Sequence, residues 1–95
     1  MSLIQHFVNG KSYKGNSNRK GKVFNPATGE QESEVILGSK EDLNNTVNIA
    51  RKAFESWSLK PPLQRARVMF KFKELIERNS EEIAKLIDSE HCKVY

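Results

Sequence analysis

Residues 38–57 read GSKEDLNNTVNIARKAFESW, and this stretch has the spacing of an amphipathic helix. Its apolar residues recur every three or four positions, which places them along one helical face. They are Leu43, Val47, Ala50, Phe54 and Trp57. Ser39 is followed three residues later by Asp42, close to a capping box, and acids in the first turn suit the helix dipole. The stretch therefore predicts a helix over about 40–57.

Two more helices are predicted after this one. Pro61-Pro62 cannot continue a helix but can open the next, over about 62–78. The stripe of that helix comprises Met69, Phe72 and Ile76, with Val68 and Leu75 beside it. Such a stripe is typical of core packing rather than of a cofactor site, and Glu74 and Arg78 stand four apart in the favourable acid-first order. A third, short helix over about 80–91 carries Ile83, Leu86 and Ile87.

The part of the chain before these helices reads as strands and tight turns, over about 5–37. Asn9-Gly10 lies between β-favouring stretches, and this pair supplies the two positive-φ residues of a type I′ hairpin turn. A second hairpin is predicted from Val23-Phe24, through a turn at Asn25 to Gly29, to a strand near 35–37. Strands followed by helices indicate an α+β fold with N-terminal hairpins and three amphipathic helices.

The composition is that of a small, polar globular protein. The chain has 95 residues, of which 37% are hydrophobic and 29% charged, so it allows one small domain with a thin stability margin. No apolar run approaches the roughly 20 residues that span a bilayer, and the start lacks the features of a secretory signal. We therefore expect a soluble, cytoplasmic protein with no membrane partner. One cysteine and two histidines make a poor zinc site, so no metal is expected.

The net charge of +4 is concentrated in one segment. Residues 9–22 contain no acid but five basic residues, Lys11, Lys14, Arg19, Lys20 and Lys22. This run could mark a nucleic-acid or anionic surface. A solvated, turn-rich segment is the better interpretation because no aromatic residues are interleaved and no reading element accompanies it. We expect no nucleic-acid partner.

The chain shows little that could perform chemistry. Glycine-rich phosphate loops and a Gly-x-Ser-x-Gly elbow are absent from the sequence. His6 has no predictable partner, and the carboxylates are interpreted as solvated groups on helix faces. His91 adjoins Cys92, but neighbours on a helix point about 100° apart, and a helix C-terminus disfavours a thiolate. The residues therefore predict no catalytic, cofactor-binding or metal-binding site.

Several segments, in order, resemble the N-terminal part of the aldehyde dehydrogenase superfamily. They are FVNGK, VFNPATGE, EDLNNTVNIARKAFESW, RARVMFKFKELIERNSEEIAKLI and EHCK. Within the superfamily the stretch RVMFKFKELIE is most similar to the CoA-acylating branch, the methylmalonate-semialdehyde dehydrogenases. The resemblance implies that residues 1–95 form a single partial domain of a longer NAD-dependent oxidoreductase, in which a catalytic Cys, a general-base Glu and the NAD-binding units lie beyond the matched region.

The resemblance implies no cofactor for this chain, and NAD and CoA for the parent family. It leads us to expect a truncated chain, inactive alone, whose parent oxidises a semialdehyde to an acyl-CoA. The alternative is a binding or assembly module that pairs with a full-length relative, with the missing remainder or with itself through exposed apolar helix faces. A small basic nucleic-acid-binding protein is the third possibility.

The resemblance also gives Cys92 a meaning. Family members read Glu-x-Gly-Lys at this place, so Cys92 replaces a glycine that suits a left-handed helix cap. A cysteine held at positive φ would cost roughly 1–2 kcal/mol. The sequence therefore predicts a strained or altered helix end there.

Overall fold

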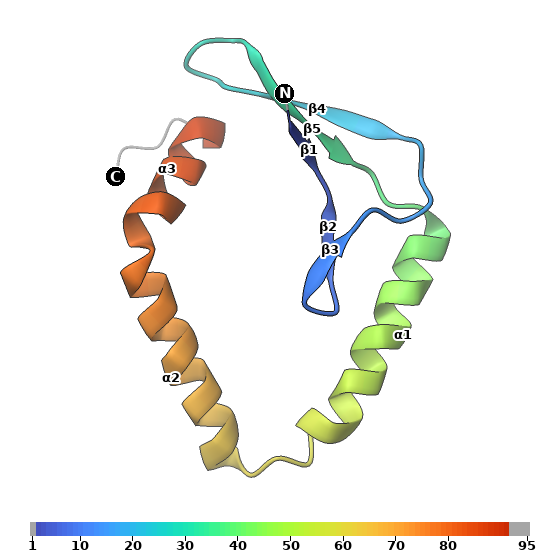
Figure 1. Cartoon of the computed structure of the whole chain (residues 1–95), viewed down its shortest axis with the longest axis vertical. Coiled ribbons are helices and arrows are strands. Elements are labelled where there is room, and N and C mark those ends of the chain that lie inside the picture. The colour runs from blue at the N-terminus through green and yellow to red at the C-terminus, as the bar shows by residue number, and fades with distance from the viewer. Residues whose placement is uncertain (1, 92–95) are drawn as a thin grey trace.

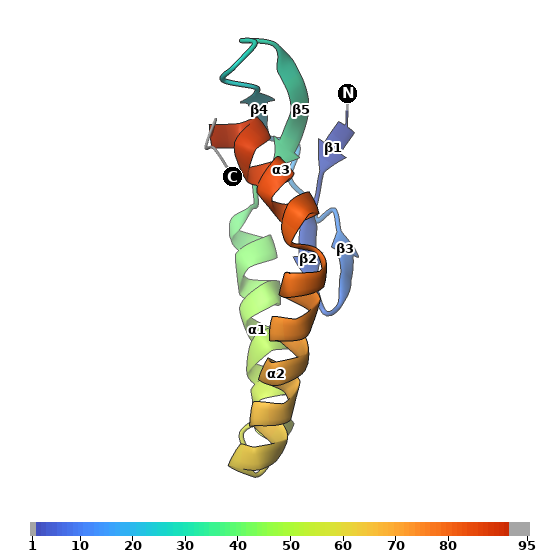
Figure 2. The same cartoon turned by 90° about the vertical axis from the view of Figure 1, so that its left-hand side faces the viewer.

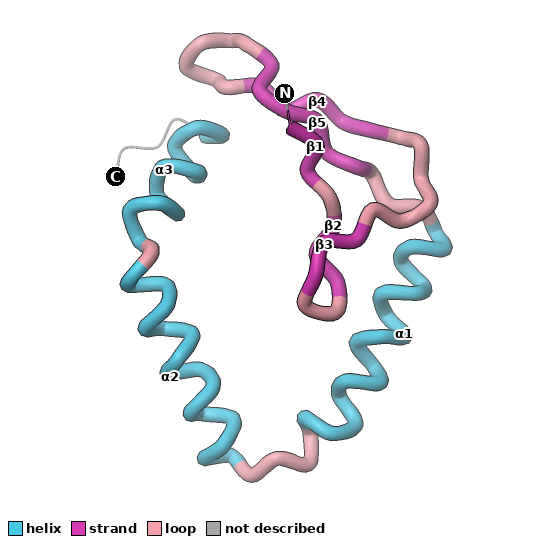
Figure 3. Tube along the Cα trace, in the orientation of Figure 1, coloured by secondary structure: helices cyan, strands magenta, loops and turns pink. Residues whose placement is uncertain are grey.

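The computed structural model describes residues 2–91 and contains strands followed by helices, which confirms the predicted α+β class (Figure 1). The strands are β1 (Ser2–Ile4), β2 (His6–Val8), β3 (Lys11–Tyr13), β4 (Lys20–Phe24) and β5 (Gln31–Ile36). The helices are α1 (Lys40–Trp57), α2 (Pro62–Arg78) and α3 (Ser80–His91). Figure 3 shows the helices as two arms of the molecule. The sheet of β1, β4 and β5 lies at one end, and the β2–β3 hairpin lies between the two arms.

Both predicted hairpins are present. β2 and β3 pair antiparallel with His6 opposite Tyr13, and the turn between them has φ of 56° at Asn9 and 76° at Gly10. These two positive values are what a type I′ turn requires, and they confirm the role of the Asn-Gly pair. β4 and β5 form the second antiparallel pair, and the turn that connects them is closed by the Gly29 N–H, which donates to the Asn25 carbonyl at 2.7 Å.

The first strand corrects the predicted start of the sheet. Strand structure begins at Ser2 rather than near residue 5, and β1 lies parallel to β5 with Ser2 opposite Ser33 and Ile4 opposite Val35. The three-stranded sheet has the order β1-β5-β4, while β2 and β3 form a separate two-stranded sheet. A three-residue strand is too short to show a period in the sequence, so its pairing with a segment far along the chain was not predictable.

The three helices have the predicted bounds. Ser39 caps α1 and forms a complete capping box with Asp42, as the spacing predicted. Pro62 opens α2, where its missing N–H removes no helical hydrogen bond. The predicted pair of Glu74 and Arg78 is formed, with 2.8 Å between Oε1 and Nη2.

The helices form an open frame instead of a layer over the sheet. α1 makes one arm, α2 and α3 make the other, and the β2–β3 hairpin lies between the arms (Figure 1). Turned by 90°, the molecule is a thin slab (Figure 2), and its extents are 48 × 35 × 15 Å. A helix with its side chains is about 10–12 Å across, so the slab holds little more than one layer of structure.

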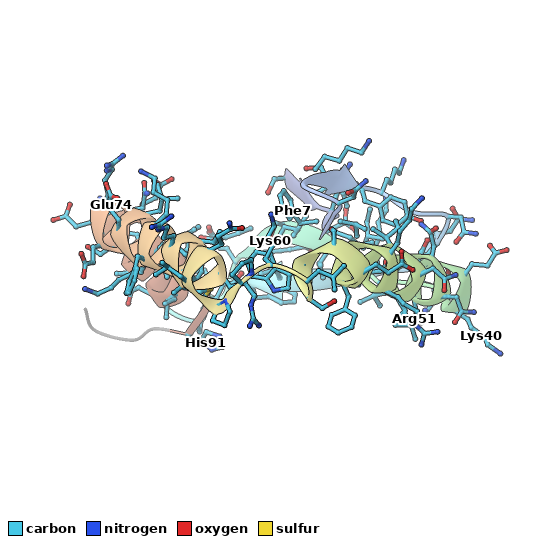
Figure 4. The ribbon with its side chains drawn as sticks, turned by 90° about the horizontal axis from the view of Figure 1, so that it is seen from below. Phe7, Lys40, Arg51, Lys60, Glu74 and His91 are labelled. Atoms are coloured by element: carbon cyan, nitrogen blue, oxygen red, sulfur yellow. The ribbon has the colours of Figure 1, made fainter. Side chains whose placement is uncertain are left out.

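The described residues bury very little apolar surface. Only Val8 and Ile36 are buried hydrophobic residues among them. The helical stripes that the sequence predicted as core are exposed, including Phe54 on α1 and Phe72 and Ile76 on α2. The expected exposed apolar helix faces are therefore present, because no element of residues 2–91 covers the stripes and their core role is not filled within this chain. Side chains project from α2 around its ribbon in the view from below (Figure 4).

Candidate functional site

The most highly connected polar residue of the described chain is Asp42, at the start of α1. Its Oδ1 accepts hydrogen bonds from the Tyr13 hydroxyl at 3.1 Å and from the Asn16 backbone N–H at 3.2 Å. Its Oδ2 accepts from the Ser39 backbone N–H at 3.0 Å. Asp42 is 4% exposed, so one carboxylate joins the β2–β3 hairpin, the following loop and the helix start. We call this cluster the Asp42 joint, comprising Tyr13, Gly15, Asn16, Ser39 and Asp42.

Hydrogen bonds among its neighbours hold the joint in one arrangement. The Ser39 hydroxyl donates to Asn16 Oδ1 at 2.7 Å and accepts from the Asp42 N–H at 3.0 Å. The Asn45 side chain donates to the Tyr13 hydroxyl at 3.3 Å. Gly15 has φ of +73°, and a Cβ built there would lie 2.5 Å from Asp42 Oδ1. Both the backbone conformation and the space therefore require glycine at position 15.

These hydrogen bonds also determine the charge of Asp42. The Ser39 backbone N–H is the largest cause that lowers the pKa of Asp42 below its ordinary value of 3.8, and Asn16 and Tyr13 act in the same direction against the effect of burial. A carboxylate whose oxygens are all engaged with donors is a poor general base. The Asp42 joint is a structural connection and has no arrangement for proton transfer.

The lowered pKa predicts how the joint responds to acid. The stabilisation from ionised Asp42 is complete well above pH 3.8, the ordinary value, and is lost as the pH falls through the lower pKa of the folded state. In an NMR titration the Asp42 carboxyl carbon should show a midpoint below 3.8, and the Asn16 and Ser39 amide signals should move with it. Asp42→Asn should remove that transition from both amides. A midpoint at or above 3.8 would contradict the prediction.

A groove of about 630 Å³ opens beside the joint. It lies between β2 and the first turns of α1, and its lining includes His6, Val8, Gly38 and Leu43. The His6 Nε2 atom is buried and has no hydrogen-bond partner within residues 2–91. A Cβ at Gly38 would lie 3.7 Å from the imidazole, which is an ordinary van der Waals contact. The groove is also lined by Ser39, Lys40, Asp42 and Thr46, but none of them forms a hydrogen bond with His6 Nε2. The oxygens of Asp42 accept from Tyr13, Asn16 and Ser39 instead, so the groove contains no hydrogen-bonded catalytic pair.

The structure corrects one interpretation of the charged residues. The carboxylates were expected to be solvated on helix faces, but Asp42 is buried because donors from three segments converge on it. Of the basic run at 9–22, Arg19 donates from Nη2 to the Gly38 carbonyl at 2.7 Å, so part of that run is used within the fold. Residues 2–91 contain no group of three potential metal ligands.

The absence of catalytic, cofactor and metal residues, and the single partial domain over 1–95, stay predictions. His91 ends α3, whereas Cys92 and the predicted strain at that position lie outside the described residues. In the described part no helix is both long enough and apolar enough to pass through a membrane.

The sequence did not single out Arg65, on α2. Its Nε atom is buried and has no hydrogen-bond partner within the described chain. Arg65 lies four and seven positions before Met69 and Phe72, and thus on the same exposed apolar face of the helix. An arginine within an apolar stripe was the available signal, but its missing partner could only be found from the structure.

Comparison with known proteins identifies the class. The model of the aldehyde dehydrogenase family matches residues 13–95. The chain belongs to the aldehyde dehydrogenase family, and it corresponds to the N-terminal part of such a protein. The resemblance read from the sequence is therefore confirmed.

More particular similarities are to the semialdehyde dehydrogenases. A malonate-semialdehyde dehydrogenase of Pseudomonas aeruginosa is 41% identical over 98% of this chain and 18% of the relative, and one of Halalkalibacterium halodurans is 38% identical over 97% and 19%. A solved structure from Oceanimonas doudoroffii, a methylmalonate-semialdehyde dehydrogenase, superposes with a TM-score of 0.91 at 44% identity over 96% of this chain and 18% of that one.

A protein of Sinorhizobium meliloti, described as a methylmalonate-semialdehyde dehydrogenase and solved with NAD, gives a TM-score of 0.91 at 40% identity. It is matched over 94% of this chain and 18% of its own length. The chain thus spans about a fifth of the length of the relatives that it matches.

Proposed function

We propose that this chain is the N-terminal structural part of an NAD-dependent malonate- or methylmalonate-semialdehyde dehydrogenase, and that it has no activity by itself. In the complete enzyme the reaction would oxidise a semialdehyde to an acyl-CoA, with NAD as the oxidant and CoA as the acyl acceptor. The observation that carries the proposal is the superposition of nearly the whole chain, at 40–44% identity, on about a fifth of two such enzymes.

The exposed surface supports the need for a partner. A folded monomer of 10.9 kDa is expected to have about 5,600 Å² of accessible surface. This chain has 7971 Å², and its radius of gyration is 17.0 Å where about 13 Å is usual for this length. The excess surface is of the size that obligate interfaces bury. In this proposal the rest of a dehydrogenase covers the helices, and pairing with a separate full-length relative or a second copy is the alternative.

The start of α1 is not arranged to bind the phosphates of NAD. A helix N-terminus can bind a phosphate through free N–H groups, but at the start of α1 the N–H groups of Ser39 and Asp42 are already used within the capping box. The ionised carboxylate of Asp42 would also repel a phosphate at that place. NAD and CoA therefore belong to the proposed complete enzyme, and no chemical step is assigned to residues of this chain.

A chimera tests the proposal. The matched segment of the Pseudomonas aeruginosa relative is replaced by this chain, and the chimera, the unchanged relative, the relative with the segment deleted and this chain alone are each given malonate semialdehyde, NAD and CoA. We expect NADH from the first two only. The deletion is the matched control, because it removes the segment without substituting another. Turnover by the chain alone, or an inactive chimera, would refute the proposal.

A further inference from the structure

The exposed surface of α2 is not uniform, and one face of it combines apolar side chains with an unpaired cation. Val68, Met69, Phe72, Leu75 and Ile76 form this face and are all exposed. Arg65 heads the same face, because offsets of three, four and seven residues return to one side of a helix. We call these six residues the α2 face.

Arg65 has no counter-charge within the described chain. The two acids of α2 are already paired along the helix, Glu74 with Lys71 and Arg78, and Glu77 with Lys73. The backbone N–H of Arg65 donates to the Pro61 carbonyl, but its side chain forms no hydrogen bond or ion pair with residues 2–91, and its Nε atom is buried. Arg65 as a whole is half-buried, and an Nε–H group withdrawn from water without an acceptor is unfavourable. Arginines are enriched in the buried parts of interfaces, where a carboxylate can bind the guanidinium through two parallel hydrogen bonds.

We infer that the α2 face is a docking surface for an apolar segment that carries a carboxylate opposite Arg65, supplied by the later part of an aldehyde dehydrogenase chain. The inference rests on the proposed function, and it adds the face, the charge and the anchoring residue. The occupant is argued from two observations. About four fifths of the length of the related enzymes lies outside the part matched here, and the unpaired charge on the face is positive.

A second copy of this chain fits the α2 face less well. A two-fold dimer through these residues would bring the Arg65 side chains of both copies toward the same apolar contact. The helix carries five basic residues and two acidic ones, so two copies of it repel each other. Neither copy has a free carboxylate on α2 to offer, because Glu74 and Glu77 are both paired.

The chimera described above tests the charge at Arg65. Arg65→Met, Arg65→Lys and the control Arg67→Met are compared by thermal unfolding. Arg67 is exposed and lies about 200° around the helix from Arg65, so its loss should change the midpoint by less than about 2 °C. Arg65→Met should lower the midpoint by at least about 5 °C, because it leaves the carboxylate of the occupant unpaired, and Arg65→Lys should recover part of the loss.

The order of the variants separates a charge partner from simple packing. If the face met only apolar groups, Met would be tolerated as well as Arg or better, and Lys would be the worst. That order, or equal effects at positions 65 and 67, in an active chimera would overturn the inference and leave the proposed function intact. An insoluble or inactive chimera would overturn the proposed function and the occupant together.

The chain alone provides a test that does not depend on the chimera. Hexanoate and hexan-1-ol have the same apolar length, and only hexanoate carries a carboxylate. In NMR titrations the amides of α2 should respond at a hexanoate concentration at least about threefold lower than for the alcohol, and Arg65→Met should abolish the difference. Equal responses would overturn the charge character of the face, and a dimer abolished by Arg65→Glu would assign the face to a second copy.

Discussion

Heated on its own, the chain should unfold over a broad temperature range, and probes of different elements should give different midpoints. Cooperative unfolding requires elements that share a buried core, but the described residues bury only Val8 and Ile36 among their hydrophobic side chains. The helices do not pack over the three-stranded sheet, so the helices and this sheet should unfold with little effect on each other. Two probes measure the unfolding. Far-UV circular dichroism follows all the helices, and the fluorescence of Trp57 follows the end of α1.

A variant of the sheet makes this prediction specific. Ile36 is 3% exposed at the end of β5, and its truncation to alanine in a cooperative domain costs about 2–5 kcal/mol. In this chain Ile36→Ala should speed amide exchange in β4 and β5 and leave the helical dichroism curve unchanged. Coincident, sharp transitions above about 65 °C for both probes, or a shift of the helical curve in the variant, would contradict the expected independence of the elements.

Local spacing was sufficient to predict most of the secondary structure. The Asn9-Gly10 turn, the capping box at Ser39 and the proline start of α2 are each specified within a few residues, so the sequence predicts them directly. The parallel pairing of β1 with β5 joins residues about thirty positions apart, and no local pattern specifies it. An apolar stripe predicts that one face of a helix is buried, but it does not identify the segment or chain that buries it.

The candidate sites also combine contacts that local spacing predicts with contacts between distant parts of the chain. The contact between Ser39 and Asp42 follows from a spacing of three residues, whereas the Tyr13 and Asn16 contacts of Asp42 cross 29 and 26 positions. Those long-range donors are what convert a helix cap into a joint between hairpin and helix. The unpaired state of Arg65 is likewise a property of the whole fold, since it depends on where every acid of the described chain lies.

Replacing Gly15 by alanine should open the Asp42 joint. Two costs combine at this position, because the backbone has φ of +73° and the new Cβ would lie 2.5 Å from Asp42 Oδ1. The first is roughly 1–2 kcal/mol for any residue with a side chain. The second forces the carboxylate away from Asn16 and Tyr13, which then lose their acceptor. Exchange of the Asn16 and Ser39 amides should become at least about tenfold faster, since opening by 1.4 kcal/mol accounts for a factor of ten.

Gly29→Ala separates the two costs of the Gly15 substitution. Gly29 has nearly the same φ, +75°, but a Cβ there meets nothing within 4 Å, so this variant carries the backbone cost alone. It should loosen the β4–β5 turn and leave the Asn16 and Ser39 amides as protected as in the original chain. If Gly15→Ala also leaves them protected, the joint tolerates displacement of Asp42, and the carboxylate does not hold the hairpin to α1. If both variants expose these amides equally, the effect comes from backbone conformation rather than from the contact with Asp42.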